Sequence, residues 1–160
     1  MKEMILAAKI EVYQKEELSE AYKLLLDTAK KASDSAYAPY SHFKVGCAVR
    51  LKSGRIVTGN NQENAAYTAG LCAERVAIHQ ATACFPDDPI ESLALIAQMD
   101  GQWTKEVCTP CGECRQVMKE VEFRTLHPIT MLLANATEIY KISGIDTLLP
   151  LGFNGSALSK

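Results

Sequence analysis

The spacing of apolar and polar residues changes several times along the chain, and each change marks a different predicted element. From about residue 15 to 32, apolar residues recur at helical spacing and line one face, which predicts an amphipathic helix. Two apolar stretches at 43–51 and 55–59, joined by a Ser-Gly turn, predict a β-hairpin. A nearly continuous apolar run at 92–99 is typical of a buried central strand.

The remaining elements are shorter. Residues 72–84 have the composition of a helix that ends before Pro86, and a second short helix is expected over 111–121, directly after Pro110. Two more strands, at 129–134 and 138–142, and a helical turn at 145–149 complete the series. The order α-β-β-α-β-α-β-β predicts an α/β fold, a three-layer α-β-α sandwich around a mixed sheet of about five strands.

Composition narrows the possible classes of protein. The 160 residues contain no internal repeat and no linker rich in Gly, Pro or Ser, so we expect a single domain over residues 1–160. Lys and Arg number 17 and Asp and Glu 19, a net charge of −2, which leaves no basic surplus for binding nucleic-acid phosphates. No apolar run approaches the roughly 20 residues that span a bilayer. Since the N-terminus also lacks a signal-peptide pattern, we expect a cytoplasmic protein with no membrane partner.

Six cysteines therefore stand in a reducing compartment, where clustered thiols serve metals or catalysis more often than disulfides. Cys111 and Cys114 are three residues apart at the start of a predicted helix, so both sulfurs lie on one edge of it. Cys72 begins the other predicted helix, and the positive field of a helix N-terminus favours the thiolate that zinc requires. If the two N-termini meet, three thiolates hold one zinc ion and leave its fourth position for water, as in catalytic sites.

Glu74 adds the second part of a hydrolytic site. It follows Cys72 by two residues, so its carboxylate is offset around the same turn and can contact the water rather than the ion. Zinc lowers the pKa of a bound water to about 7, and a neighbouring carboxylate can accept that proton and pass it on.

These residues alone leave other readings open. A structural zinc site of four cysteines would add Cys108 to the three thiols. A redox CxxC pair would require a thioredoxin-like βαβ context, which Pro110 before Cys111 does not supply. The two cysteines could also be inert and buried.

Five motifs in order along the chain resemble the small, homotetrameric, zinc-dependent cytidine deaminases. The zinc-deaminase signature has the form H-x-E…P-C-x-x-C, and here a cysteine replaces the histidine, as in that small type. The motifs are YSHFKVG at 40–46, GNNQENAAY at 59–67, CAER at 72–75, PCGECRQ at 110–116 and LLPLGF at 148–153. Thr109, where the family usually has serine, and the extra thiol of Cys108 depart from the pattern.

The resemblance implies one Zn²⁺ per subunit, a set of site residues and a reaction. It makes Glu74 the proton shuttle and places Arg75 near the thiolates. The metal ligands are Cys72, Cys111 and Cys114, and the substrate contacts are Phe43 against the nucleoside, Asn61 and Glu63 on the ribose hydroxyls, Ala73, Thr109 and Pro110 through their backbones, and Phe153 from a neighbouring subunit. The implied reaction is hydrolytic deamination of cytidine and 2′-deoxycytidine to uridine and 2′-deoxyuridine, with release of ammonia, as part of pyrimidine salvage. The resemblance also implies a homotetramer whose active sites lie near the subunit interfaces.

Three competing functions are weighed against it. Deaminases of the antibiotic blasticidin S share the metal motifs, but the run from Asn61 to Tyr67 favours a ribose. A deaminase of nucleic acid is disfavoured by the charge, the length and the cysteine first ligand. A structural zinc module would bind zinc and release no ammonia from cytidine.

Overall fold

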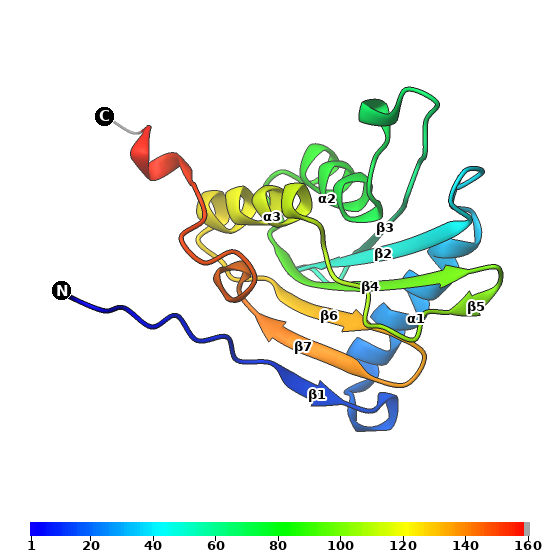
Figure 1. Ribbon diagram of the computed structural model, residues 1–160, viewed down its shortest axis with the longest axis horizontal. Coiled ribbons are helices and arrows are strands. Elements are labelled where there is room, and N and C mark those ends of the chain that lie inside the picture. Colours follow the sequence, from blue (N-terminus) through cyan, green and yellow to red (C-terminus); the bar gives the residue numbers. More distant parts are fainter. Residues whose placement is uncertain (159–160) are drawn as a thin grey trace.

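A mixed, seven-stranded sheet forms the middle layer of the molecule (Figure 1). The computed structural model describes residues 1–158, so the predicted domain of 160 residues extends two residues beyond the described range. Its strands are β1 (Glu11–Tyr13), β2 (Phe43–Leu51), β3 (Ile56–Asn60), β4 (Ile90–Met99), β5 (Gln102–Trp103), β6 (Thr130–Ala134) and β7 (Ile139–Ser143). The spatial order is β1-β7-β6-β4-β2-β3, with β5 beside β4, and the β4–β6 pair is parallel while the others are antiparallel.

The three-layer α/β prediction is confirmed, but the expected number of strands, about five, is wrong. The two strands that the sequence pattern missed are β1, which pairs with β7, and β5, which pairs with β4. They contain three and two residues, too few to show a period of two along the chain. Both form because a longer neighbouring strand offers them a hydrogen-bonding edge.

One helix, α1 (Glu20–Asp34), covers one face of the sheet. The prediction that it begins near residue 15 is wrong, because Ser19 caps it by accepting a hydrogen bond from the Tyr22 amide (3.4 Å), and a separate 3-10 turn occupies Lys15–Glu17. The side chains of Leu25, Leu26 and Ala29 are fully buried or nearly so, and they pack on Ala48, Ala94, Ile96 and Leu132 of the sheet.

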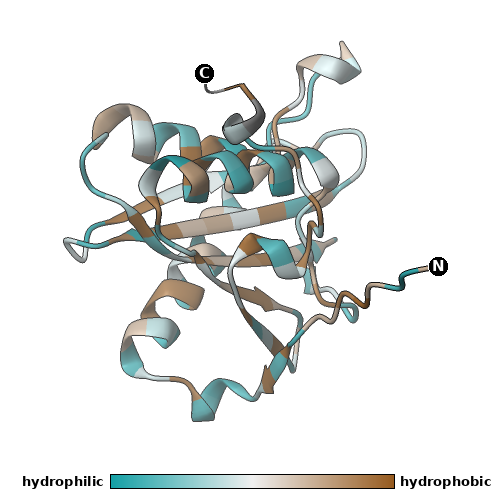
Figure 2. Ribbon diagram, turned by 90° about the vertical axis from the view of Figure 1, so that its left-hand side faces the viewer, coloured by the Kyte–Doolittle hydropathy of each residue, from teal (hydrophilic) through white to brown (hydrophobic). Residues whose placement is uncertain are grey.

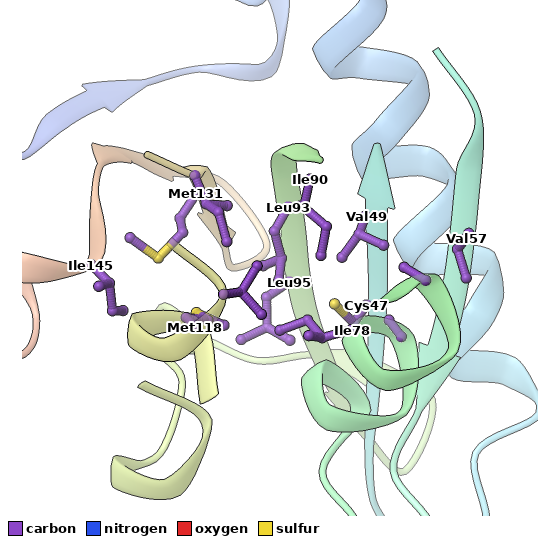
Figure 3. Close-up of a cluster of buried hydrophobic side chains, with 14 of the residues drawn as sticks. Cys47, Val49, Val57, Ile78, Ile90, Leu93, Leu95, Met118, Met131 and Ile145 are labelled. Atoms are coloured by element: carbon purple, nitrogen blue, oxygen red, sulfur yellow. The ribbon is translucent and has the colours of Figure 1, made fainter. Parts of the chain in front are cut away.

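Two helices, α2 (Ala73–Cys84) and α3 (Gly112–Thr125), cover the opposite face. Because strand side chains alternate between faces, Cys47, Val49, Leu93 and Leu95 point away from α1 and toward Ile78 of α2 and Met118 of α3 (Figure 3). Figure 2 shows hydrophobic residues running along the central strands, while the helices carry both hydrophobic and hydrophilic residues.

Gly59 on β3 sets how closely α2 approaches the sheet. A Cβ atom at this position would lie 2.4 Å from the backbone nitrogen of Ala77 and 2.5 Å from the carbonyl oxygen of Ala73. Contacts this short with backbone atoms cannot be relieved by turning a side chain. The absence of a side chain at Gly59 therefore permits α2 to lie this close to β3, including its first residues, which carry the candidate chemistry.

Residues 1–10 form an extended, largely exposed segment that leads into β1 (Figure 1). Among the described residues, none of the helices has the length and apolar character needed to cross a membrane.

Candidate metal centre and active site

The first turns of α2 and α3 bring three cysteine thiols together. Cys72 is the N-cap residue of α2, Cys111 is the N-cap residue of α3, and Cys114 lies in the first turn of α3. The Cys72 and Cys111 sulfurs are 3.8 Å apart, the Cys111 and Cys114 sulfurs are 3.5 Å apart, and all three lie within 4.8 Å of one another. The sequence expectation that the two helix N-termini meet is therefore matched by the geometry.

The donor set fits a zinc ion. A tetrahedral zinc with Zn–S bonds of about 2.3 Å holds its sulfurs about 3.8 Å apart, close to the separations measured here. Three soft sulfur donors at two helix N-termini suit zinc better than a hard cation such as magnesium. Cys111 is exposed while Cys114 is buried, so the cluster lies where the core meets the surface.

The thiols of Cys72 and Cys114 differ in their affinity for a proton. A hydrogen bond from the Cys114 thiol lowers the pKa of Cys72, and the neighbouring Arg75 guanidinium lowers it further. The same hydrogen bond, together with burial, raises the pKa of Cys114. One thiolate is thus already favoured at Cys72, and metal binding would displace the proton held at Cys114.

Glu74 lies beside the cluster on the buried side of α2. Its side chain is buried, with a residue exposure of 4%. Burial raises the pKa of this carboxyl to about 7, and the charge of Cys72 adds to the rise. A carboxyl group with a pKa close to neutrality can both accept and donate a proton, which is the property required of an acid–base group.

Arg75, the next residue on α2, is held beside the thiols by two contacts. Its Nη2 atom donates to the carbonyl oxygen of Gly70 (3.1 Å) and forms an ion pair with Oε2 of Glu113 (3.3 Å). Arg75 therefore lies close enough to Cys72 to interact with its sulfur. Glu113, which belongs to the PCGECRQ motif, is a partner of Arg75 that the sequence pattern did not reveal.

Cys108 lies outside the group of three thiols. It packs with Val107 against the buried cluster beneath α2 and α3, and burial raises its pKa to about 12. All six cysteines, each within the described residues, carry free thiols. The arrangement therefore matches three protein ligands rather than a four-cysteine structural site.

Asn61 and Glu63 are engaged with the chain itself. The Asn61 side chain accepts a hydrogen bond from the Val45 amide and donates one to the Phe43 carbonyl, both at 2.8 Å. Glu63 accepts hydrogen bonds from the hydroxyl of Ser41 and from the amides of Tyr40 (2.9 Å) and Ser41 (3.3 Å). The Ser41 hydroxyl is the largest cause of the lowered pKa of Glu63. These two side chains thus fix the backbone around Phe43.

The other residues expected at the substrate site are spread over several segments. Phe43 is half-buried at the start of β2, and Ala73 is buried at the start of α2. Thr109 is exposed, whereas Pro110 is buried and its carbonyl oxygen accepts a hydrogen bond from Nε of Arg115 (2.8 Å). Phe153 is 60% exposed on the protomer.

A surface cavity of about 490 Å³ lies away from the thiol cluster. Its walls come from the N-terminal segment, from Lys119 of α3 and from residues 146–152 near the C-terminus. The residues that line it include none of the expected catalytic or metal-binding residues.

Comparison with known proteins identifies the family. The family described as "Cytidine and deoxycytidylate deaminase zinc-binding region" matches residues 19–129. A cytidine deaminase of Halalkalibacterium halodurans is 40% identical over 99 residues, which cover 62% of this chain and 70% of that protein. A cytidine deaminase of Mycobacterium tuberculosis is 39% identical over 102 residues, with the same two coverages of 62% and 70%.

Comparison with solved structures indicates the same family. The crystal structure of a cytidine deaminase from Burkholderia pseudomallei superposes with a TM-score of 0.70 at 36% identity, covering 81% of this chain and 97% of that one. The structure of the Mycobacterium tuberculosis enzyme has a TM-score of 0.61 at 30% identity, covering 82% and 96%. The match of residues 19–129 spans both thiol motifs, and the chain therefore belongs to the cytidine and deoxycytidylate deaminase family.

Proposed function

We propose that the protein catalyses the hydrolytic deamination of cytidine and 2′-deoxycytidine, in which water replaces the amino group at C4 and uridine or 2′-deoxyuridine and ammonia are produced. The observation that carries the proposal is the group of three thiol sulfurs within 4.8 Å of one another, with the buried carboxyl group of Glu74 beside them. The family membership and the names of the relatives support the same reaction.

Cys72, Cys111 and Cys114 would hold one zinc ion per subunit. When bound, zinc supplies a water molecule that loses its proton near neutral pH. Glu74 would take that proton and deliver it to ring N3. It would then take the second proton from the new hydroxyl group at C4 and pass it to the amino group, so that the C4–N bond breaks, ammonia leaves and C4 keeps a carbonyl oxygen. The buried position of Glu74 beside the thiol cluster suits both steps, because a carboxyl group there is shielded from bulk water and close to the proton that it must move.

Arg75 would offset the negative charge of three thiolates on a divalent ion, which otherwise weakens the acidifying effect on water. Its lowering effect on the pKa of Cys72 supports this role.

The substrate would be held by residues from several segments of the chain. We assign the ribose hydroxyls to Asn61 and Glu63, and packing against the nucleoside to Phe43. The pyrimidine would contact the backbone at Ala73, Thr109 and Pro110. The hydrogen bonds of Asn61 and Glu63 to residues 40–45 leave both side chains with unused donor or acceptor capacity for a diol.

We further propose a single catalytic domain over residues 1–160 and a homotetramer, acting in pyrimidine salvage in the cytoplasm, in which Phe153 of one subunit closes the site of another. The exposure of the Phe153 ring on the protomer supports this assignment.

An ultraviolet assay of cytidine conversion, with ammonia measured in parallel, tests the proposal. We expect turnover by the zinc-loaded protein, loss of turnover after chelation, and recovery when zinc is restored. Parallel assays with 2′-deoxycytidine and blasticidin S define the substrate, and turnover of blasticidin S alone would overturn the nucleoside assignment. Tight zinc binding without ammonia release from any of them would overturn the enzymatic role.

A further inference from the structure

The first two turns of α3 carry three consecutive residues that face different parts of the molecule. The sulfur of Cys114 joins the thiol cluster. The next residue, Arg115, donates from Nε to the carbonyl oxygen of Pro110 (2.8 Å) and from Nη1 to that of Leu148 (2.9 Å). Gln116 then donates from Nε2 to the carbonyl oxygen of Phe153 (2.8 Å). An expected metal ligand thus lies next to two residues whose side chains donate hydrogen bonds to the C-terminal part of the chain.

We call residues 148–153 the carboxyl-terminal arm. Its backbone hydrogen bonds are local, from the amides of Leu148 and Leu149 to the Ile145 carbonyl and from the amide of Gly152 to the Leu149 carbonyl. The side chains of Leu148 and Leu149 pack on the buried cluster, so the base of the arm is anchored by apolar contacts. Toward the tip, Leu151 and Phe153 are 83% and 60% exposed. The side chain of Gln116 therefore supplies a hydrogen bond at the part of the arm whose own side chains are exposed.

Arg115 makes two hydrogen bonds in different directions, which a lysine at the same position could not reproduce. A guanidinium group is planar and presents several N–H donors in a fixed arrangement, whereas an ammonium is a single point of charge. Here two of these donors reach carbonyl groups 38 residues apart in sequence, one in the arm and one directly before Cys111. Because the guanidinium is half-buried, a displaced carbonyl would not be fully compensated by water.

We infer that Arg115 and Gln116 are positioning residues that couple the carboxyl-terminal arm to the metal-binding turn. Arg115 fixes the backbone before Cys111 and the base of the arm together. Gln116 fixes the direction in which the arm presents Phe153. For the substrate this inference rests on the proposed function, in which Phe153 closes an active site, whereas its structural part concerns zinc retention and arm order alone.

The two residues have separable effects, which an experiment on the zinc-loaded protein measures. Arg115→Lys keeps the positive charge but removes the planar guanidinium group with its two donors. We expect this variant to transfer zinc to a chromophoric chelator about tenfold faster, which is the lower end of the effect of outer-shell partners on metal affinity. Gln116→Met keeps the length and removes the donor. It should leave zinc transfer unchanged but speed amide exchange in the arm about fivefold, as expected for loss of one neutral hydrogen bond. In cytidine assays Gln116→Met should raise KM and leave kcat unchanged.

Arg124→Lys is the matched control, because Arg124 lies exposed in the last turn of the same helix. It should change none of these quantities. Equal zinc transfer from Arg115→Lys and Arg124→Lys would overturn the inference for Arg115. Unchanged arm exchange in Gln116→Met, or a fall in its kcat with KM constant, would overturn it for Gln116. If the parent protein does not convert cytidine, the proposed function fails, while zinc transfer and arm exchange still decide this inference.

Discussion

The sulfurs of Cys72 and Cys111 are separated by 39 residues of sequence and lie 3.8 Å apart. Each is the N-cap residue of a helix on the same face of the sheet. Neither thiol caps its helix through a side-chain hydrogen bond, so both sulfurs remain available to a metal ion. Two helix N-termini that meet in this way also concentrate positive potential where thiolates are needed.

Cys111→Ser should abolish stoichiometric zinc binding, because two thiols cannot supply the three protein ligands of a catalytic zinc site. Zinc content after gel filtration, measured by atomic absorption, checks this. Cys84→Ser, at an exposed cysteine outside the cluster, is the matched control and should keep one zinc per chain. Cys108→Ala should also keep it, and zinc loss in that variant would reinstate the four-cysteine site.

Glu74→Gln should retain zinc and the fold but lower kcat by about 10²- to 10⁴-fold, the usual contribution of a positioned acid–base group. Glutamine preserves the shape of the side chain and cannot exchange a proton. Steady-state assays alongside zinc analysis separate the two effects. Glu106→Gln, on an exposed loop, is the control; wild-type turnover in Glu74→Gln would remove the carboxyl from the reaction.

Arg75→Gln should weaken zinc binding or activity by about 10- to 100-fold, as expected for a residue that supports metal ligands. Glu113→Gln removes the partner of Arg75 but should change either quantity by less than about twofold, because Glu113 is largely exposed and surface ion pairs contribute little. Chelator competition on both variants measures the difference. Equal effects of the two substitutions would mean that the ion pair, rather than the arginine, supports the thiols.

Glu122→Ala should reduce the free energy of unfolding by about 1–3 kcal/mol, because it leaves partly buried donors without a partner. The carboxylate accepts hydrogen bonds from the amides of Ile129 (2.8 Å) and Ile145 (3.0 Å), which follow α3 on separate segments. Urea denaturation of the zinc-loaded protein measures the loss. Glu120→Ala, at an exposed position two residues earlier, should cost far less.

The same carboxyl makes stability depend on pH. Burial raises the pKa of Glu122 above its ordinary value of 4.5, so the folded chain binds the proton more tightly than the unfolded chain. The part of its stabilisation that comes from this tighter proton binding is therefore complete below pH 4.5 and is lost as the pH rises through the folded pKa, while the hydrogen bonds to the two amides remain. The wild-type advantage over Glu122→Gln should shrink with increasing pH across this window; an advantage that grows would contradict the direction of the shift.

Local patterns in the sequence predicted much of the fold. The bounds of β2, 43–51, were predicted correctly, because a polar stretch with Pro39 precedes the apolar run and a Ser-Gly turn follows it. Strands β1 and β5 were missed because only their partners create them. The helix expected over 111–121 runs from residue 112 to 125, since capping at its C-terminal end depends on Leu126 in a left-handed conformation, which composition does not signal.

The site could be predicted only in part, because local sequence patterns reveal some of its contacts and not others. Spacing brought Cys111 and Cys114 together, and helix starts suggested the approach of Cys72. The hydrogen bonds of Glu63 to Tyr40 and Ser41, and of Arg115 to Leu148, join residues 22 to 33 positions apart. No periodicity encodes such contacts, because they depend on how loops lie after the layers have packed.

Because Gly59 lies so close to α2, a substitution in β3, away from the thiol cluster, can still impair zinc binding. Adding a single methyl group at residue 59 would push the helix off the strand and carry Cys72 away from its two companions. A genetic screen for zinc-deficient mutants of this protein would accordingly recover substitutions in a strand that offers the ion no donor atom.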